Sequence, residues 1–277
     1  MNSTDNNSTK GLCKINRRVI TATHSNCEPE VDWVIEEQAI ALVFNQISHA
    51  VMMATPRDLL DFAIGFSLSE GIINQAKDIL TYEIVEAEQG IEVQLGISSR
   101  QFSALKHKRR SLLGNSGCGL CGVESLAQTV KTRAKLEPIT LLSFDVVNQA
   151  VTTFTQQQQL NQLTGSAHAA AFCAVDTGEI LCIREDVGRH NALDKLLGAL
   201  AQQPAYNTEL QRQQGFILVS SRASYEMVDK TIAAGIHHLV SISAATSKAI
   251  QWAQQHQLNL IGFARSNRHL RYSQPHK

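Results

Sequence analysis

The amino-acid sequence predicts an α/β protein, α+β overall, in which β-hairpins come first and alternating strands and helices follow. In the first half, two pairs of apolar runs are each joined by a short turn, as in β-hairpins. In the second half, apolar runs of strand length are separated by stretches with helical spacing, which is typical of βαβ units. The 277 residues are 43% hydrophobic and 18% charged, a composition that allows a proper hydrophobic core.

Charge and cysteine content narrow the class of protein. The 25 basic and 25 acidic residues balance, so no field of the whole chain favours nucleic acid or a membrane surface. No segment approaches the roughly 18 uninterrupted apolar residues of a membrane span, and the polar start of the chain does not look like a secretory signal. The six cysteines are too sparse for a disulfide framework, which predicts a reducing, cytoplasmic location.

The predicted organisation has three parts. Residues 1–27 are expected to form a flexible N-terminal arm. Residues 28–137 are expected to form an N-terminal α+β subdomain that ends in the loop of Cys118 and Cys121 and the helix after it. Residues 138–277 are expected to form a C-terminal α/β domain, because Pro138 and the polar residues around it mark a boundary.

Local signals define the elements of the N-terminal part. Two apolar runs flank Asn45-Gln46 and predict a hairpin. The sequence from Thr55 to Asp58 has a capping-box-like pattern, which predicts a helix with Pro56 at its first position and Gly71 at its end. The elements predicted here are hairpins of residues 39–44 with 47–53 and 81–86 with 91–97, that helix, and helices of residues 101–113 and 123–133.

The second half alternates between the two kinds of element. Apolar strands joined by helices imply right-handed crossovers and a largely parallel sheet covered on both faces. The strands are predicted at residues 170–175, 180–183, 215–219, 238–242 and 258–263, and the helices at residues 144–158, 191–200, 224–234 and 247–256.

Cys118 and Cys121 form a CxxC pair inside a glycine-rich loop, residues 114–122. Such a pair is typical of dithiol redox chemistry, half of a zinc site, a nucleophilic or persulfide-forming cysteine, or coincidence. A structural zinc site needs four ligands, and no second close pair exists. A helix rather than a strand precedes the motif, which disfavours a thioredoxin-like protein. A thiol on a glycine-rich loop suits an acceptor that docks on one protein and then reaches another.

A basic run, Lys106 to Arg110, precedes this loop. Together with the start of the following helix it would favour the reactive thiolate. The alternative is that the run is only the solvated face of a helix. Cys173 and Cys182 fall on predicted strands and are interpreted as small buried apolar residues.

Polar side chains gather where the strands of the second half end. If these ends are adjacent, their hydroxyls, arginines and helix N-termini form one crevice for a phosphorylated or nucleotide-bearing ligand. The alternative for each is a simple capped helix with an ion pair. No GxxxxGK[ST] motif supports P-loop hydrolysis. The segments are Arg184–Asn191, Ser220–Glu226, Ser243–Ser247 and Gly262–Arg268.

His168 begins an apolar strand, where a histidine is either a hydrogen-bonded core residue or a ligand. Zinc nucleobase deaminases carry a Glu two residues after such a His, as general acid and base. Here that position is Ala170, so deaminase activity is not expected.

Together these stretches resemble the formate dehydrogenase accessory sulfurtransferase family. The resemblance covers about residues 39–268, nearly the whole globular part. Two of its motifs, in this order after the Cys loop, are specific in combination: EDVGRHNALDK and SSRASYEM. The matching segments are LVFNQISHAVMMATPRDLLDFAIGFSLSEGII, GNSGCGLCGVESL, HAAAF, EDVGRHNALDKLLG, LVSSRASYEMVDK and SISAAT.

The resemblance implies a fold and an activity. The C-terminal domain would have a three-layer core similar to cytidine deaminases, without their zinc chemistry and without a permanent metal. The chain would be a sulfurtransferase that takes persulfide sulfur from a cysteine desulfurase on Cys118, with Cys121 as its partner. It would pass the sulfur to the molybdenum bis(molybdopterin guanine dinucleotide) cofactor before insertion into the catalytic subunit of formate dehydrogenase. The resemblance also suggests a homodimer, with no nucleic-acid or membrane partner.

The expected cofactor site combines the resemblance with the strand ends. The family's aromatic and basic stretch falls on Phe263, Ala264, Arg265, Ser266, Asn267 and Arg268, and the strand ends add Ser221, Arg222 and His190. The chain departs from the family pattern at Gly165-Ser166-Ala167, where Gly-Gly-Thr or Gly-Cys-Thr is expected, which weakens a ligand contact there. Two other functions remain open: a cofactor-binding chaperone without catalysis, and a CxxC dithiol oxidoreductase.

Overall fold

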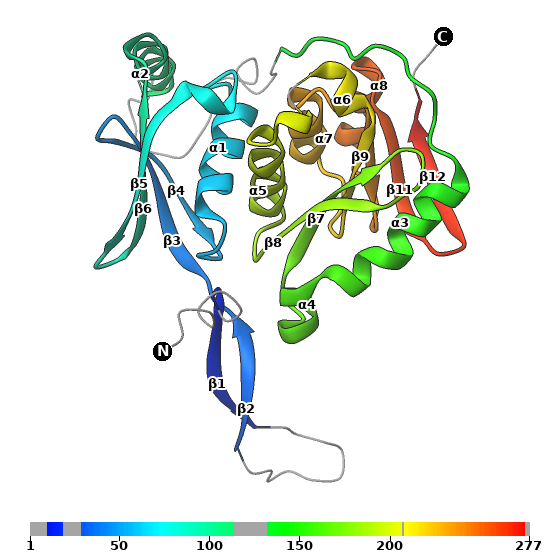
Figure 1. Cartoon of the computed structure of the whole chain (residues 1–277), viewed down its shortest axis with the longest axis horizontal. Helices are drawn as coiled ribbons and strands as arrows, with labels where there is room; N and C mark the ends of the chain where they lie inside the picture. Colours follow the sequence, from blue (N-terminus) through cyan, green and yellow to red (C-terminus); the bar gives the residue numbers. More distant parts are fainter. Residues whose placement is uncertain (1–9, 19–28, 114–131, 207, 275–277) are drawn as a thin grey trace.

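The computed structural model describes residues 10–18, 29–113, 132–206 and 208–274. The described chain forms three parts (Figure 1): an N-terminal subdomain with a four-stranded sheet, a larger C-terminal domain with a six-stranded sheet, and a two-stranded ribbon that projects from them. The mixed α and β composition predicted from the sequence is confirmed. Within the described ranges, no helix is both long and apolar enough to cross a membrane.

The projecting ribbon differs from the predicted flexible arm of residues 1–27 in the one part of that arm that the structure describes, residues 10–18. Strand β1 (Leu12–Arg18) pairs antiparallel with β2 (Pro29–Ile35), and Arg17 makes an ion pair of 2.8 Å with Asp32 across them. The base of the ribbon is held by a small apolar cluster in which Leu12 packs against Leu160 and Ala167 of the C-terminal domain. An isolated two-stranded ribbon is only marginally stable in water. The contact with Leu160 and Ala167, which lie far from the ribbon in the sequence, therefore stabilises it.

The N-terminal sheet has the strand order β4-β3-β6-β5, and both predicted hairpins are confirmed. Asn45 and Gln46 both have positive φ, 45° and 69°, as a two-residue turn with the twist of a hairpin requires. Strands β3 and β6 pair in parallel and join the two hairpins. The strands are β3 (Gln38–Phe44), β4 (Ile47–Ala54), β5 (Ile79–Ala87) and β6 (Gly90–Ile97).

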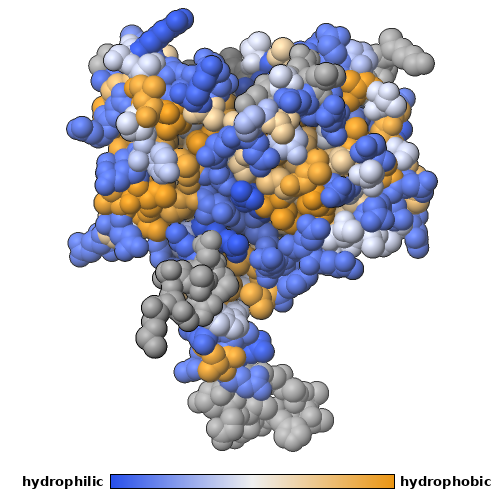
Figure 2. Space-filling model, in the orientation of Figure 1, coloured by the Kyte–Doolittle hydropathy of each residue, from blue (hydrophilic) through white to orange (hydrophobic). Residues whose placement is uncertain are grey.

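Helices α1 (Leu59–Ser69) and α2 (Ser99–Leu113) belong to this subdomain. The predicted start of α1 is wrong: Asp58, with φ 54°, is the residue before the helix, so Pro56 lies outside it. Gly71, with φ 66°, follows its end as predicted. One face of α1 packs on the sheet through Phe62. On the face of the molecule in Figure 2, apolar side chains gather over this subdomain.

The C-terminal sheet has the strand order β12-β11-β10-β9-β7-β8. The expectation of a largely parallel sheet holds only for β9, β10 and β11, and the other three pairings are antiparallel. The hairpins β7–β8 and β11–β12 explain two of these pairings, because a tight turn returns the chain antiparallel. In the third, β7 pairs with β9, which runs in the same direction as β8. The strands are β7 (His168–Ala174), β8 (Ile180–Asp186), β9 (Gly215–Val219), β10 (His238–Ser241), β11 (Asn259–Arg265) and β12 (Arg268–Ser273).

Helices cover both faces of this sheet, which explains why its central strands are apolar without alternation. On one face, Phe154 of α3 packs with Phe216 and Leu218 of β9. On the other, Leu193 of α5 and Met227 of α7 pack with Ile217. The helices are α3 (Phe144–Gln157), α4 (Gln159–Thr164), α5 (Arg189–Ala201), α6 (Glu209–Gln213), α7 (Tyr225–Ala233) and α8 (Ser247–Gln255), with single 3₁₀ turns η1 (Ala76–Asp78) and η3 (Pro204–Tyr206).

The two sheets are joined by the crossing of α1 and α5. At the crossing the two backbones are in contact: a Cβ on Gly65 would overlap the carbonyl oxygen of Asp194, and one on Gly198 would overlap that of Asp61. Only glycine allows this approach. The contact fixes the N-terminal subdomain against the C-terminal domain.

Candidate functional site

Four of the segments predicted to carry function meet at one edge of the C-terminal sheet. Strands β8, β9, β10 and β11 point in the same direction, and β7 begins where they end. Backbone bonds connect the segments: Ser220 donates to Ala169, and Phe263 donates to Ser243, at 3.0 and 2.9 Å. We call this edge the strand-end crevice, after the predicted ligand site, and define it by the start of α5, Ser220–Glu226, Ser243–Ser247 and Gly262–Arg268. Ligands of open α/β sheets bind at such strand ends.

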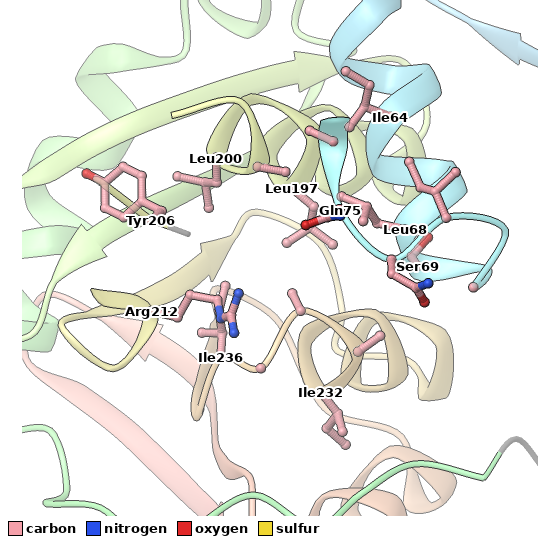
Figure 3. Close-up of a pocket in the computed structure, with 18 of the residues that line it drawn as sticks. Ile64, Leu68, Ser69, Gln75, Leu197, Leu200, Tyr206, Arg212, Ile232 and Ile236 are labelled. Atoms are coloured by element: carbon pink, nitrogen blue, oxygen red, sulfur yellow. The ribbon is translucent and has the colours of Figure 1, made fainter. Parts of the chain in front are cut away.

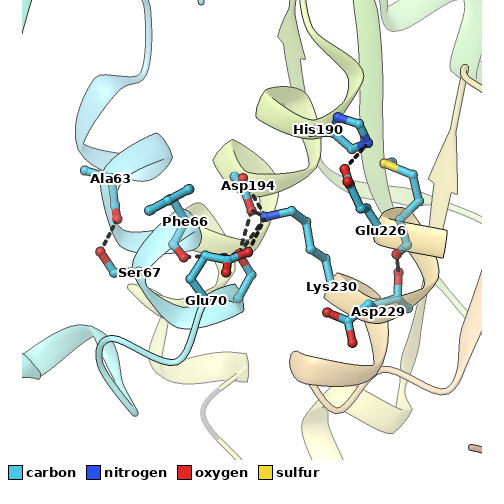
Figure 4. Close-up of polar contacts among 12 residues, drawn as sticks. Ala63, Phe66, Ser67, Glu70, His190, Asp194, Glu226, Asp229 and Lys230 are labelled. Carbon is cyan, nitrogen blue, oxygen red and sulfur yellow. Dashed lines mark hydrogen bonds and ion pairs between the residues drawn. The ribbon is translucent and has the colours of Figure 1, made fainter. Parts of the chain in front are cut away.

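The first turns of α5 and α7 meet at the strand-end crevice. His190 Nε2 lies 2.8 Å from Glu226 Oε2 (Figure 4). Burial lowers the pKa of His190, Glu226 opposes this change, and Arg189 adds to it. The first turns of both helices therefore lie at this edge, where their free N–H groups and positive dipole ends favour a negative group, and Glu226 already supplies one.

Four further residues of this edge were not among the expected cofactor residues: His168, Arg189, Ser220 and Ser224. His168 Nδ1 lies 3.5 Å from Ser220 Oγ, and burial together with Arg189 lowers the pKa of His168. Arg189 Nε and Ser224 Oγ are buried without a hydrogen-bond partner among the described residues. Buried polar atoms are nearly always paired. Arg189 precedes the predicted His190 in the EDVGRHN motif, which is the signal that pointed to it.

Ser221 and Arg222 differ in what they can offer a ligand. The Ser221 hydroxyl donates to the Arg222 carbonyl at 3.1 Å, and the Ser221 carbonyl accepts from Ser241 Oγ at 2.6 Å. Ser221 is buried, so its groups hold the loop together. Arg222 is exposed, and its guanidinium faces solvent at the strand ends.

The turn between β11 and β12 carries the predicted aromatic and basic stretch. Phe263 has a φ of 50° and is 40% exposed, an uncommon backbone conformation for an aromatic residue. The register between β11 and β12 shifts here, as at a β-bulge. The side chain of Ala264 is buried in the core, whereas Arg265, Ser266, Asn267 and Arg268 are exposed. The stretch therefore presents one ring and two guanidinium groups to solvent.

Most of the cluster Arg184–Asn191, predicted as a site, is structural. Glu185 accepts from the backbone N–H groups of Leu160 and Asn161, both at 2.9 Å, and so holds the start of α4. Arg184 pairs with Asp61 of α1 at 2.8 Å. Asp186 and Asn191 bind each other and the N-terminal subdomain. Only Arg189 and His190 of this cluster belong to the strand-end crevice.

Two buried ion pairs join the subdomains, and sequence reasoning missed both. Lys195 pairs with Asp186 at 2.6 Å and donates to the Thr55 carbonyl at 2.9 Å. Lys230 donates to both carboxylate oxygens of Asp194 (Figure 4). Burial lowers the pKa of Lys195, and the neighbouring Asp186 opposes that change. The charged groups of both pairs are therefore bound to partners inside the protein.

Cys118 and Cys121, the predicted catalytic residues, lie outside the described residues, as does most of the predicted helix 123–133. The chain is described again from Thr132, and Arg133 binds Asp229 through Nε and Nη2 at 2.9 and 2.8 Å. Residues 132–137 line a cavity at the edge of the sheet opposite the strand-end crevice. The first described residues after the cysteines therefore lie at one edge of the sheet, and the predicted cofactor residues lie at the opposite edge.

Comparisons with known proteins give one consistent result. The model of the FdhD/NarQ family matches residues 35–277. The chain is 49% identical over 246 residues to "Sulfur carrier protein FdhD" of Cupriavidus necator, which covers 89% of this chain and 83% of that protein. It also matches the crystal structure of a formate dehydrogenase accessory protein from Desulfotalea psychrophila, with a TM-score of 0.70 and 22% identity, over 95% of this chain and 97% of that one.

Proposed function

Because the chain belongs to the FdhD/NarQ family, we propose that it is a sulfurtransferase with a cysteine persulfide intermediate on Cys118. The sulfur donor is a cysteine desulfurase, and the acceptor is the molybdenum bis(molybdopterin guanine dinucleotide) cofactor of formate dehydrogenase. The observation that carries this proposal is a CxxC pair in a chain 49% identical to a protein named a sulfur carrier.

The loading step is a thiol exchange. The Cys118 thiolate attacks the outer sulfur of the desulfurase persulfide, the donor S–S bond breaks, and the donor cysteine leaves as a thiolate. Cys118 then carries a persulfide. No net oxidation or reduction takes place, so the step needs no further reactant.

The release step has two routes that differ in the role of Cys121. In the first, the cofactor takes the outer sulfur directly and supplies the two electrons that reduce this sulfur to the sulfide level, and Cys118 returns to a thiol. In the second, the Cys121 thiolate attacks Sγ of Cys118, hydrosulfide leaves toward the molybdenum, and a Cys118–Cys121 disulfide forms. The second route consumes two electrons from a thiol reductant in each cycle, so the two routes differ in their need for reductant.

The guanine nucleotide of the cofactor is proposed to bind at the strand-end crevice. Phe263 offers a face on which a purine ring can stack, since it is exposed and fixed by its backbone. Arg222, Arg265 and Arg268 are suited to the phosphates. Ser266, Asn267 and His190 supply hydrogen bonds at the rim, whereas Ala264 and Ser221 contribute through the backbone, because their side chains are turned inward.

The protein is proposed to act in the cytoplasm as a homodimer that serves formate dehydrogenase. The cysteine usage supports a cytoplasmic location. Formate dehydrogenase is the expected recipient of the sulfurated cofactor, and the active protein is proposed to be a homodimer. Gel filtration with light scattering tests the dimer, because a mass near twice the 30.4 kDa of one chain is expected.

Sulfur loading is tested with radiolabelled cysteine. The protein is incubated with a cysteine desulfurase, pyridoxal phosphate and cysteine that carries labelled sulfur, and the products are separated without reductant. Label that enters the wild type and Cys121→Ala, but not Cys118→Ala, supports the proposal. Unlabelled protein that still binds guanine nucleotide would indicate the cofactor-binding chaperone instead. A Cys118–Cys121 disulfide that oxidises protein thiols, without label, would indicate the dithiol oxidoreductase.

A further inference from the structure

A cavity of about 1430 Å³ lies between the two subdomains, at the edge where the parallel strands begin (Figure 3). Its walls come from α1 and the chain that follows it, from residues 132–137, from the last turns of α5 and α7, and from α6 and η3. His237, which directly precedes β10, marks this edge of the sheet. The cavity is therefore separate from the strand-end crevice. Its size is sufficient for a small organic ligand, since such pockets usually measure about 300–1,000 Å³.

Apolar side chains face one another across the cavity, while the rest of its lining is polar. Figure 3 shows Leu197 and Leu200 of α5 on one side of the space and Ile232 and Ile236 from the end of α7 on the other. Such walls favour a ligand with an apolar body, because burying apolar area stabilises a complex by roughly 25 cal/mol per Å². Further apolar side chains reach the cavity from α1 and η3, namely Ile64, Leu68 and Tyr206.

The charges on the walls are mainly positive. Arg133 is already paired with Asp229, which raises the pKa of the guanidinium. The remaining charged residues that line the cavity are the cations Lys77, Lys135 and Arg212 and one anion, Glu137. The ligand is therefore expected to carry a negative group.

Of these cations, Arg212 is the one best placed to bind the negative group of a ligand. Helix α6 holds Arg212 beside Gly235 and Ile236, with a capping box of Thr208 and Gln211 at its start (Figure 3). Arg212 Nε is buried and has no hydrogen-bond partner among the described residues. A buried guanidinium donor without an acceptor is unfavourable, and an anionic group in the cavity would supply one.

We propose that this cavity binds a small amphipathic organic anion, with its acidic group on Arg212 and its apolar body between α5 and α7. The site is separate from the proposed nucleotide site, since none of the residues assigned to the nucleotide lines it.

Two fluorescent probes that differ only in charge test the proposal: 8-anilinonaphthalene-1-sulfonate and its uncharged counterpart N-phenyl-1-naphthylamine. We expect one molecule of the sulfonate to bind per chain. Arg212→Met should weaken the binding of the sulfonate about tenfold, as loss of a charge-assisted hydrogen bond predicts. It should leave the affinity for the neutral probe unchanged. Arg212→Lys should restore part of the loss, and Arg100→Met, on the exposed α2, should change neither affinity.

Other results would overturn the proposal. Equal affinity of wild type and Arg212→Met for the sulfonate would show that Arg212 does not bind the anion. Equal losses for both probes, with Arg212→Lys no better than Met, would show that Arg212 only supports α6. Several sulfonate molecules per chain would show general surface binding. Circular dichroism of each variant establishes that it is folded.

Discussion

Lys230 Nζ lies 2.8 and 2.9 Å from the two carboxylate oxygens of Asp194, where α5 and α7 meet the end of α1. Ser69 Oγ, at the end of α1, lies 2.8 Å from the same ammonium and 3.0 Å from the carboxylate. Asp194 is 2% exposed and Lys230 is 6% exposed. The pair therefore links the N-terminal subdomain to two helices of the C-terminal domain without contact with solvent.

Removal of one partner of this pair should be strongly destabilising. Lys230→Met leaves the Asp194 carboxylate buried and unpaired, so the free energy of unfolding should fall by about 3–5 kcal/mol. The double variant Lys230→Met with Asp194→Leu should lose less, because no uncompensated charge remains. Urea unfolding of the three proteins provides the comparison. A loss below about 1 kcal/mol for Lys230→Met would mean that the pair is open to water.

The crossing of α1 and α5 should not tolerate a methyl group. Gly198→Ala places a Cβ on the Asp61 carbonyl, and we expect a loss of at least about 1–3 kcal/mol, as for overpacked cores. Gly165→Ala is the control: that glycine has φ 66° but open space around it, so only backbone strain of about 1 kcal/mol is expected. Thermal unfolding measures both. Equal losses for the two variants would contradict close contact of the helices.

His238 should make stability depend on pH. It is 1% exposed, Asn259 Nδ2 lies 2.9 Å from its Nδ1, and burial lowers its pKa to about 3. The folded state binds this proton less readily than the unfolded state, so the contribution is complete above pH 6.5 and is lost as the pH falls toward 3. Across that range the slope should be about 1.4 kcal/mol per pH unit.

His238→Gln isolates this slope, because glutamine does not titrate. Its free energy of unfolding should fall less steeply than that of the wild type between pH 6.5 and 4, whatever its value at pH 7. His107→Gln, on the exposed α2, should keep the wild-type slope. Parallel curves for wild type and His238→Gln would show that His238 is protonated in the folded protein.

Phe263 should matter more for nucleotide binding than for stability. Phe263→Gly relieves the positive φ but loses the packing of the buried part of the ring and adds freedom to the unfolded chain, so the free energy of unfolding should change by no more than about 1 kcal/mol. The same change removes the proposed stacking face, and the affinity for guanosine diphosphate should fall about tenfold or more. Calorimetric titration measures the second effect. Tyr82→Ala removes an aromatic side chain that is 56% exposed on the other subdomain, and it should leave nucleotide affinity unchanged. An unaltered affinity of Phe263→Gly would remove Phe263 from the site.

The sequence predicted those elements whose signals are local. The hairpin turn at Asn45-Gln46, the glycine after α1 and the apolar run of β9 each fix their own conformation, and the structure confirms them. Elements held by distant partners were missed. Strand β1 depends on Leu160 and Ala167, more than a hundred residues away, and β12 exists only through its pairing with β11.

The sequence predicted where the candidate site lies, but not which of its residues are free to bind a ligand. The clustering of polar residues at strand ends follows from topology, so the strand-end crevice was predictable. The division of the EDVGRHN motif into structural and available residues was not, because Asp186 and Asn191 bind groups from the N-terminal subdomain. Which charges become buried is decided by packing between segments far apart in sequence.

The most direct test of the proposed function is peptide mass spectrometry of the protein after incubation with a cysteine desulfurase, L-cysteine and pyridoxal phosphate. The peptide that contains Cys118 should gain the mass of one sulfur atom, lose it on treatment with dithiothreitol, and gain it again on renewed incubation. The gain should persist in Cys121→Ala. A peptide of unchanged mass, or a gain that persists in Cys118→Ala, would contradict the sulfur-carrier function.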